Sequence, residues 1–286
     1  VYNRANLINR TILSVLAQSY KNFELIIVDD GSTDESISIV KSFETESEIH
    51  SAFTIPLIGD LDGNGETNIV VINADDNGWL GRGITIYNGK TKNVINTHNF
   101  VNAAVGVSGP GQIAIANVDT DPQAELFIYA SHKNAVTSSK RRRIIRYDFN
   151  SDLSTMTETW VSNQAVTGGG RSGGVIGLAD FNGDGVAEVY AENDIFNTQT
   201  GVRLINGSVS PSGQTWSNNG HGETGITVAA DLTDAPGLEL AAGTSVFEFD
   251  FVNVNGEIGN SYNEIPLGQN NDGFTSIADM DNDGEL

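Results

Sequence analysis

A short acidic loop between two apolar runs occurs five times along the chain, and this repetition constrains the fold more than any other feature. The copies begin roughly 50 to 60 residues apart, at Asp60, Asn117, Asp180, Asp231 and Asp279. A motif with such a period is the signature of a repeat architecture, in which each repeat is one supersecondary unit. Residues 1–45 do not share the pattern, so we expect a separate segment there.

Apolar runs flank the loops and predict a series of short strands. Runs at 54–58, 112–116, 175–179, 226–230 and 274–278 precede the loops, and runs at 69–72, 126–129, 189–191 and 238–242 follow the first four. A further alternating run occupies residues 84–87, 144–147, 202–205 and 246–249. Three to four strands per repeat are typical of one β-propeller blade. Asn88-Gly89 and Asn206-Gly207 follow two of these runs and predict hairpin turns with positive φ angles.

The fold class predicted from this pattern is mainly β. We expect residues 53–286 to form an incomplete β-propeller, with about four blades and the start of a fifth, after a junction at residues 46–52. The composition agrees, because 32 glycines and a hydrophobic content of 38% suit short strands joined by tight turns. Residues 1–45 are expected to form a short α/β segment.

The loops carry side-chain oxygens at alternating positions. In the third copy, positions 1, 3 and 5 are Asp180, Asn182 and Asp184, and position 6 is a glycine. Side chains at this spacing direct their oxygens toward one centre, which is how calcium is bound in loops. The loops are not EF-hands, because their flanks are strands and position 12 is apolar in the first three. Instead, an acid stands at position 9 in three loops, as Glu125, Glu188 and Glu239.

The repeated region resembles the FG-GAP or VCBS-type repeats of integrin-α-like β-propellers, in which each strand–loop–strand unit binds one calcium ion. The resemblance implies calcium ligands at Asp60, Asp62 and Asn64 in the first loop, at Asn117, Asp119, Asp121 and Glu125 in the second, at Asp180, Asn182, Asp184 and Glu188 in the third, and at Asp279, Asp281 and Asp283 in the fifth. The third loop matches best, and the first has Asn68 where the acid is expected. The fourth has Ala235 at position 5 and is expected to have lost its metal. We expect the calcium to brace each loop rather than to act in catalysis, with an affinity suited to extracellular calcium.

The first 45 residues predict a helix, a strand, a turn and a second helix. Apolar residues at helical spacing form a stripe at Leu7, Ile8, Ile12, Leu13 and Leu16. Asn6 is a candidate N-cap of this helix, and Ser32 or Thr33 is a candidate cap of a second helix that begins at Glu35. Between them, the run FELIIV at residues 23–28 suits a strand buried in a parallel sheet.

This segment closely resembles the start of the nucleotide-sugar domain of family 2 glycosyltransferases. The resemblance rests on Val1-Tyr2-Asn3, on SVLAQSY at residues 14–20 and on IVDDGSTD at residues 27–34. It implies a Rossmann-like GT-A start in which Tyr2 and Asp30 contact the nucleobase. The family's later acidic metal motif and catalytic base are missing, and Asp75-Asp76 are expected in a turn between propeller strands. We therefore expect no sugar transfer, because nothing neutralises the departing diphosphate.

Composition excludes several classes of function. A formal charge of −22 argues against nucleic acid as a partner, because phosphate binding requires basic surface. No apolar run is long enough for a transmembrane helix, and the absence of cysteine excludes disulfides and thiolate metal sites. The basic run at residues 140–143, together with Arg146, is expected at a hairpin or strand edge. Trp79, Trp160 and Trp216 fall in different repeats and are expected in blade packing.

Together these observations predict a calcium-braced β-propeller that serves as a binding or scaffold module of a secreted or cell-surface bacterial protein, with a polysaccharide or a protein as ligand. One alternative is a family 2-like glycosyltransferase that uses a nucleotide sugar, for which a cytoplasmic location is expected. Another is a polysaccharide lyase-like propeller, because Gly220-His221-Gly222-Glu223 is loosely similar to rhamnogalacturonan-lyase propellers. Nucleotide sugars are found in the cytoplasm, whereas the calcium loops suit the calcium-rich fluid outside the cell, so the two parts of the chain are expected in different compartments. This conflict favours a truncated or artificially joined gene product. The ligand, the blade number of an intact protein and the oligomeric state stay open.

Overall fold

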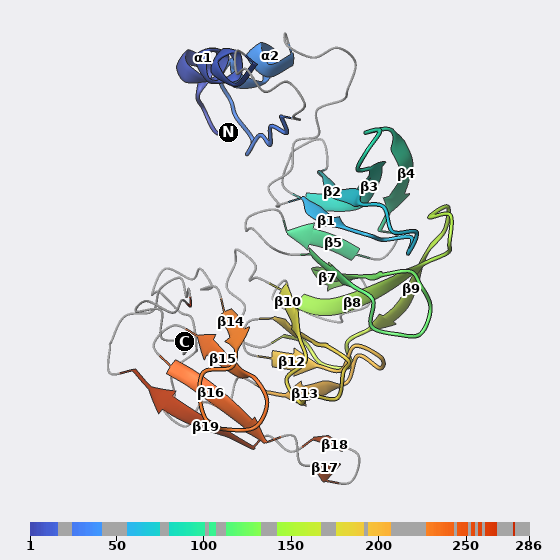
Figure 1. Cartoon of the computed structure of the whole chain (residues 1–286), viewed down its shortest axis with the longest axis vertical. Coiled ribbons are helices and arrows are strands. Elements are labelled where there is room, and N and C mark those ends of the chain that lie inside the picture. Colours follow the sequence, from blue (N-terminus) through green and yellow to red (C-terminus); the bar gives the residue numbers. More distant parts are fainter. Residues whose placement is uncertain are drawn as a thin grey trace.

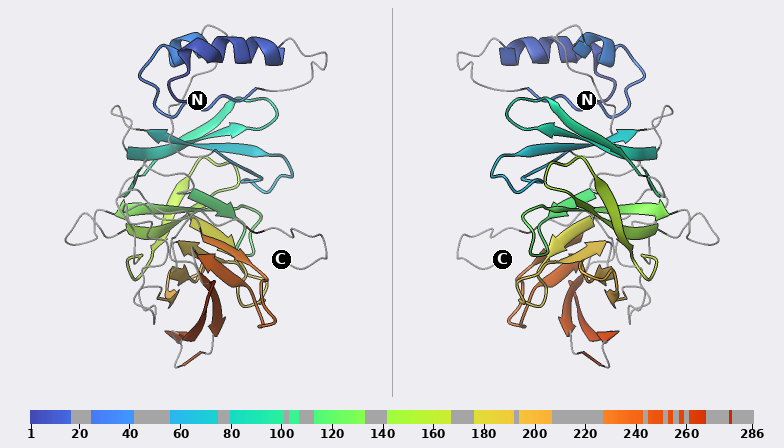
Figure 2. Two further views of the ribbon diagram at one scale, coloured as in Figure 1. Left: turned by 90° about the vertical axis from the view of Figure 1, so that its left-hand side faces the viewer. Right: turned by 90° about the vertical axis from the view of Figure 1, so that its right-hand side faces the viewer.

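The structure is a computed structural model, and it is mainly β, with four antiparallel sheets and two short helices among the described residues (Figure 1). It describes residues 1–16, 25–41, 56–74, 80–100, 103–106, 113–132, 142–166, 176–191, 194–206, 227–242, 245–250, 253–254, 257–258, 261–267 and 277. The helices lie at one end of the molecule, and the sheets follow one another in chain order (Figures 1 and 2). Neither helix is long and apolar enough to cross a membrane.

Four groups of four strands form antiparallel meanders, one for each of the first four loops. The first contains β1 (Leu57–Gly59), β2 (Asn68–Ala74), β3 (Leu80–Asn88) and β4 (Val94–Asn99). The second contains β6 (Ile113–Ala116), β7 (Glu125–His132), β8 (Arg142–Phe149) and β9 (Met156–Val161). The third contains β10 (Ile176–Ala179), β11 (Glu188–Ala191), β12 (Asp194–Phe196) and β13 (Arg203–Ile205). The fourth contains β14 (Thr227–Ala230), β15 (Glu239–Ala242), β16 (Ser245–Asp250) and β19 (Ser261–Pro266).

Three short strands lie outside this scheme. Strand β5 (Ala103–Gly106) pairs with both β3 and β7, so the first two meanders are joined into one nine-stranded sheet. Strands β17 (Asn253–Val254) and β18 (Glu257–Ile258) pair only with each other. The four meanders are hereafter called the first to fourth sheets, and the first and second of them are the two parts of the nine-stranded sheet.

Each acidic loop connects the first two strands of its sheet in the same register. The residue before the loop pairs with the residue at position 9, and the four pairs are Gly59 with Asn68, Ala116 with Glu125, Ala179 with Glu188, and Ala230 with Glu239. A register shift of one residue would move every side chain to the other face of the sheet. The shared register therefore places equivalent residues of all four loops in equivalent surroundings.

The second and third sheets lie between neighbouring sheets and are buried on both faces. In the second sheet, successive side chains of β7 point alternately to the two faces. Leu126 and Ile128 pack into a core shared with the first sheet. Phe127 and Tyr129 point to the opposite face and pack with residues of the third sheet. A third core joins the third and fourth sheets around Phe181. The sheets are thus stacked face to face in chain order, as blades are, but the described residues do not close into a ring.

The N-terminal segment has a small core of its own, in which Ile8 and Ile12 of α1 (Ala5–Leu16) pack against Val40 of α2 (Ser36–Lys41). The predicted caps are wrong. Asn6 lies inside α1, and the backbone N–H of Ala5 is instead bound by Asp34 Oδ2 at 3.1 Å. The other oxygen of Asp34 accepts a hydrogen bond from Ser36 N at 2.9 Å. One aspartate therefore serves the starts of both helices, which sequence spacing alone could not indicate.

Three further expectations need correction, and several others concern residues outside the described part of the chain. Of the strand predicted at 23–28, residues 25–28 are described and form no regular strand; the backbone of Val1 bonds to Val28 and Asp30 there. The turn after β3 has its positive φ at Lys92 rather than at Asn88-Gly89. Of the run at 202–205, residues Arg203–Ile205 form β13, which is the fourth strand of its sheet rather than the third, because β12 precedes it. The fifth loop, Asp75-Asp76, Trp79, Trp216 and residues 220–223 lie outside the described residues.

Candidate functional sites

A buried side chain at position 9 closes each of the four described loops. Its oxygen accepts a hydrogen bond from the backbone N–H at position 2, and the four pairs are Asn68 with Leu61 (2.7 Å), Glu125 with Val118 (2.8 Å), Glu188 with Phe181 (3.0 Å) and Glu239 with Leu232 (2.7 Å). All four acceptors are at most 2% exposed. Asn68 makes the same bond as the three acids, which explains how an amide replaces a carboxylate in the first loop.

The first and third loops share a hydrogen-bond pattern around their first aspartate. In the third loop, Asp180 accepts from the backbone of Asp184 at 3.1 Å and of Gly185 at 2.8 Å. In the first loop, Asp60 accepts from the equivalent residues at the same two distances. The glycines at positions 4 and 6 of both loops have positive φ, a conformation that other residues rarely adopt. The loop chemistry noted in the sequence thus produces two loops of nearly identical geometry.

Two acids in these loops have raised pKa values, and burial is the largest cause in both. Burial raises the pKa of Glu188 to about 7, and the charges of Asp184 and Asp180 contribute in the same direction. Burial also raises the pKa of Asp62, with a further contribution from Asp60. Asp62 Oδ1 is shielded from solvent and accepts no hydrogen bond within the described structure. A carboxylate oxygen in this position is costly unless a donor or cation satisfies it.

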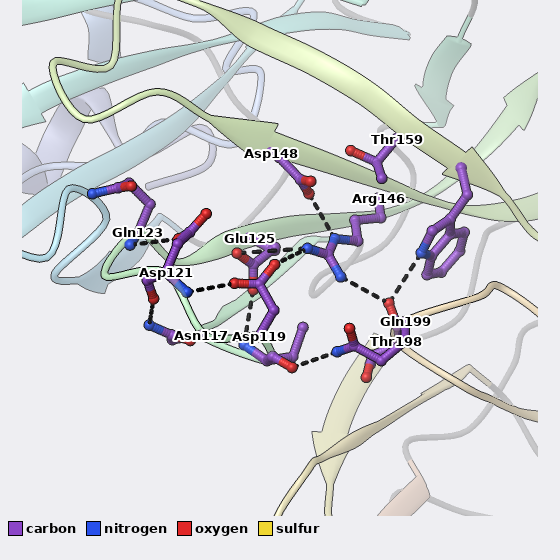
Figure 3. Close-up of polar contacts among 12 residues, drawn as sticks. Asn117, Asp119, Asp121, Gln123, Glu125, Arg146, Asp148, Thr159, Thr198 and Gln199 are labelled. Atoms are coloured by element: carbon purple, nitrogen blue, oxygen red, sulfur yellow. Dashed lines mark hydrogen bonds and ion pairs between the residues drawn. The ribbon is translucent and has the colours of Figure 1, made fainter.

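The second loop brings three carboxylates together. Oxygens of Asp119, Asp121 and Glu125 lie within 4.8 Å of one another. The guanidinium of Arg146, from β8, lies against two of them, with Nη2 at 2.5 Å from Asp119 and 3.8 Å from Glu125 (Figure 3). Its Nε lies 2.6 Å from Asp148. Arg146 is 3% exposed and lies in β8, which pairs with both β7 and β9, so the expectation that it stands at a hairpin or strand edge is wrong.

This cluster affects the ionisation of its members. Burial raises the pKa of Glu125 to about 7, although the hydrogen bond from Val118 and the charge of Arg146 oppose the shift. Burial acts to lower the pKa of Arg146, but its bonds to Asp148 and Asp119 outweigh burial and raise it. Arg146 is therefore a permanent buried cation among carboxylates. In the run at residues 144–147, Arg146 shares a side of the strand with Ile144, which packs into the core between the second and third sheets.

The fourth loop differs again. Glu239 accepts hydrogen bonds from the backbones of both Leu232 and Thr233, at 2.7 and 3.1 Å. The hydroxyl of Thr233 accepts a bond from Ala235 N at 3.2 Å. Ala235 offers no side-chain oxygen at position 5, so this loop is closed by internal hydrogen bonds with fewer candidate ligands.

A second candidate site lies at the N-terminal segment, where the two motifs that carry the transferase resemblance meet. The N-terminal amine of Val1 donates to Val28 O at 2.5 Å, and Asp30 N donates to Val1 O at 2.7 Å. These two bonds form a parallel bridge around Asp29. Tyr2, which is 54% exposed, therefore lies next to the motif that contains Asp30.

The adjacent aspartates of this motif differ in role. Asp29 is 4% exposed and binds the backbone N–H and the hydroxyl of Ser32, at 2.8 and 2.5 Å. Asp30 is exposed. Asn3 fixes the same loop from the other side by accepting a bond from Thr33 N at 2.9 Å. The first aspartate therefore holds the loop, and the second is available to a ligand.

Comparison with known proteins supports the N-terminal resemblance. Residues 1–53 match glycosyl transferase family 2. An uncharacterized glycosyltransferase of Haemophilus influenzae is 46% identical over 56 residues, which are 20% of this chain and 22% of that protein. One from Rickettsia prowazekii is 54% identical over 43 residues, which are 15% of this chain and 14% of that protein. The chain therefore spans less than a quarter of the length of these relatives.

A solved structure also shows similarity. The exotype rhamnogalacturonan lyase YesX is aligned over 66% of this chain and 34% of its own, with 18% sequence identity. The TM-score of 0.44 is too low to indicate a shared fold. The match to glycosyl transferase family 2 covers the N-terminal segment of the chain, residues 1–53.

Proposed function

We propose that the N-terminal segment binds the nucleotide part of a nucleotide sugar, as the start of a family 2-type glycosyltransferase domain. The family match over residues 1–53 carries this proposal. The placement of exposed Tyr2 beside the loop of Asp30 supports it, because an aromatic ring and a carboxylate can together stack on a base and accept its hydrogen bonds. We propose binding rather than transfer, because cleavage of the sugar–diphosphate bond needs a cation or donors at the departing diphosphate.

The test is a titration of the whole chain with UDP and with GDP, followed by saturation-transfer NMR. We expect one of the two to bind weakly, and Tyr2→Ala or Asp30→Asn to abolish the signal. Glu35→Gln is the matched control, because Glu35 is a nearby exposed acid that follows the motif at residues 27–34 and is not part of it. Equal binding by all four proteins, or by none, would refute the nucleotide proposal.

We also propose that residues 53–286 are a calcium-braced β-propeller module that binds a glycan or a protein outside the cell. The single observation that carries it is the repeated geometry of the first and third loops. Asp60, Asp62 and Asn64 would hold the ion in the first loop, and Asp180, Asn182, Asp184 and Glu188 in the third. These oxygen donors suit calcium, and Asp62 Oδ1, which is shielded from solvent and accepts no hydrogen bond within the described residues, is an oxygen that a cation would satisfy. The ion would supply positive charge that closes the loop.

Calcium calorimetry on the whole chain, together with thermal unfolding, tests this proposal. We expect micromolar to millimolar sites and a melting temperature that rises with calcium. Asp180→Asn should remove one site and Asp60→Asn another. Asp152→Asn is the control, because Asp152 lies in an exposed turn and accepts a bond from Ser154 N at 3.0 Å. A chain that binds no calcium would leave the loops as acidic turns closed by hydrogen bonds alone.

A further inference from the structure

We propose that the Arg146 guanidinium is a built-in cation that takes the metal position of the second loop, so that this loop and the junction it supports are independent of calcium. The inference rests on the proposed calcium function of the other loops. It changes the assignment of the second loop, where the sequence predicts a metal held by Asn117, Asp119, Asp121 and Glu125. It divides the loops into one that carries its own cation and others that need a cation from solution.

The first argument is the position of the charge. Nη2 of Arg146 lies 2.5 Å from Asp119 and 3.8 Å from Glu125, two of the three carboxylates that converge in this loop. A calcium ion bound by the same oxygens would lie within a few ångströms of the buried guanidinium, and two cations at that separation repel each other. One cation therefore excludes the other. Arginine suits this role because it stays protonated when buried and binds carboxylates with a planar set of donors.

The second argument is a comparison of equivalent positions in the four sheets. Arg146 pairs with position 11 of its loop, Phe127. The residues that pair with position 11 in the first, third and fourth sheets are Ile86, Ile195 and Val246. All three are apolar and cannot neutralise a carboxylate. The second sheet is thus the one sheet of the four that carries a cation at this position.

The third argument is that the backbone of the second loop differs from the backbone that the first and third loops share. Thr120 and Pro122 stand where the first and third loops have glycines with positive φ. Pro122 has no N–H to donate to a position-1 side chain. At position 1, Asn117 instead donates its own amide to Asp121 O at 2.7 Å. Changes at positions 1, 4 and 6 accompany the arginine, as expected for a loop that no longer binds metal.

Arg146 also connects two sheets. Its Nη1 donates to Thr198 O at 3.2 Å, in the turn between β12 and β13, and the indole of Trp160 donates to the same oxygen at 3.0 Å. Gln199, from that turn, donates to Val118 O in the second loop. Arg146 and Trp160, both from the second sheet, thus bind the same backbone oxygen of the third sheet (Figure 3). Loss of the guanidinium would therefore weaken the junction between the second and third sheets as well as the loop.

The experiment compares the whole chain with Arg146→Met, in chelator and in calcium, by thermal unfolding and by calcium calorimetry. We expect Arg146→Met to melt at a lower temperature in chelator, to recover part of that loss in calcium, and to bind one more calcium ion than the parent. Arg203→Met is the matched control. Arg203 is partly buried and lies 3.9 Å from buried Asp194, and its side chain also donates to Ala165 O at 3.4 Å. Neither partner belongs to an acidic loop, so calcium should not restore the stability that this variant loses.

The outcomes separate this inference from the proposed function. A parent chain that binds calcium together with a variant that gains no site would overturn the inference alone. A parent that binds none, with a variant that binds one ion, would support the inference and overturn the brace in the other loops. If Arg146→Met does not fold, Asp119→Asn in the parent decides. It should lower the melting temperature in chelator and leave the number of bound calcium ions unchanged, whereas loss of one ion would overturn the inference.

Discussion

The carboxylate of Glu188 accepts a hydrogen bond from the backbone N–H of Phe181 at 3.0 Å while it is 2% exposed. The bond spans the third loop from its second position to its ninth, and the equivalent bond is present in the other three described loops. A hydrogen bond of this kind needs an acceptor but not a charge. The negative charge on Glu188 is therefore a cost in the absence of a cation, which has a consequence for the pH dependence of stability.

Stability in chelator should fall as the pH rises from about 4.5 to about 7, to the extent that Glu188 contributes. Its pKa is raised from 4.5 to about 7 in the folded state. In this window the folded protein binds more protons than the unfolded chain, so the free energy of unfolding decreases with pH, by at most about 1.4 kcal/mol per pH unit for one group. Glu188→Gln keeps an acceptor for Phe181 N and should remove this contribution.

Urea unfolding of the parent and of Glu188→Gln at several pH values measures the effect as a difference between two proteins. Asp152→Asn serves again as a control, because Asp152 is exposed. Identical pH profiles for the parent and Glu188→Gln would show that the carboxyl group is not protonated in the folded state near neutral pH.

Gly63→Ala should destabilise the protein more than Gly183→Ala. The two glycines occupy position 4 of the first and third loops with nearly the same φ, +69° and +70°. Both substitutions strain the backbone by about 1–2 kcal/mol. At Gly63, however, an added Cβ would stand 2.1 Å from Pro122 O of the next loop, whereas at Gly183 it meets nothing within 4 Å. Chemical denaturation measures both, and equal losses would mean that the first and second loops do not pack as described.

Asp29→Asn should affect the structure of the N-terminal segment, and Asp30→Asn should affect its binding of nucleotide. Asp29 is buried and holds Ser32 through two hydrogen bonds, so its replacement should loosen the loop and expose its amides to solvent. Asp30 is exposed, and its replacement should leave the fold intact while nucleotide binding is lost. Hydrogen exchange at residues 29–36 reports the first effect, and the nucleotide titration reports the second. Protection lost in Asp30→Asn would assign it a structural role instead.

Much of the β architecture could be predicted from the sequence, because the repeat sets both the strand order and the loop positions. The apolar runs that precede and follow each of the first four loops lie in the strands on either side of it, whereas the two cores that β7 contacts are seen only in the structure. The N-terminal motif likewise predicted the family that the comparison finds. Local patterns succeed here because most of the described strands pair with a strand that is next to them in sequence.

The parts that sequence reasoning missed depend on contacts between distant segments. Asp34 caps α1, which begins 29 residues earlier, and no local spacing signals this. The sequence places Arg146 with a basic run, although its partner Asp119 lies 27 residues away in the preceding loop. The resemblance implies Glu125 and Glu188 as calcium ligands, and the structure adds a backbone hydrogen bond that each accepts without an ion. Such roles follow from register and burial rather than from residue type.

The last prediction concerns Asn68, the amide at position 9 of the first loop. Asn68→Asp keeps the side-chain length and an acceptor for Leu61 N, now at 2.7 Å, but it adds a charge at a site that is 1% exposed. In chelator the variant should be less stable than the parent by about 1–3 kcal/mol, because a buried carboxylate without a cation is costly.

In calcium the order should change, because the added carboxylate gives the first loop a position-9 acid like that of the third. We expect the calcium affinity of the first loop to rise by about tenfold, the factor that corresponds to about 1.4 kcal/mol. Calorimetry in the Asp180→Asn background isolates the first loop from the third. A variant that loses stability equally in chelator and in calcium would show that position 9 only closes the loop, and that its charge plays no part in holding a cation.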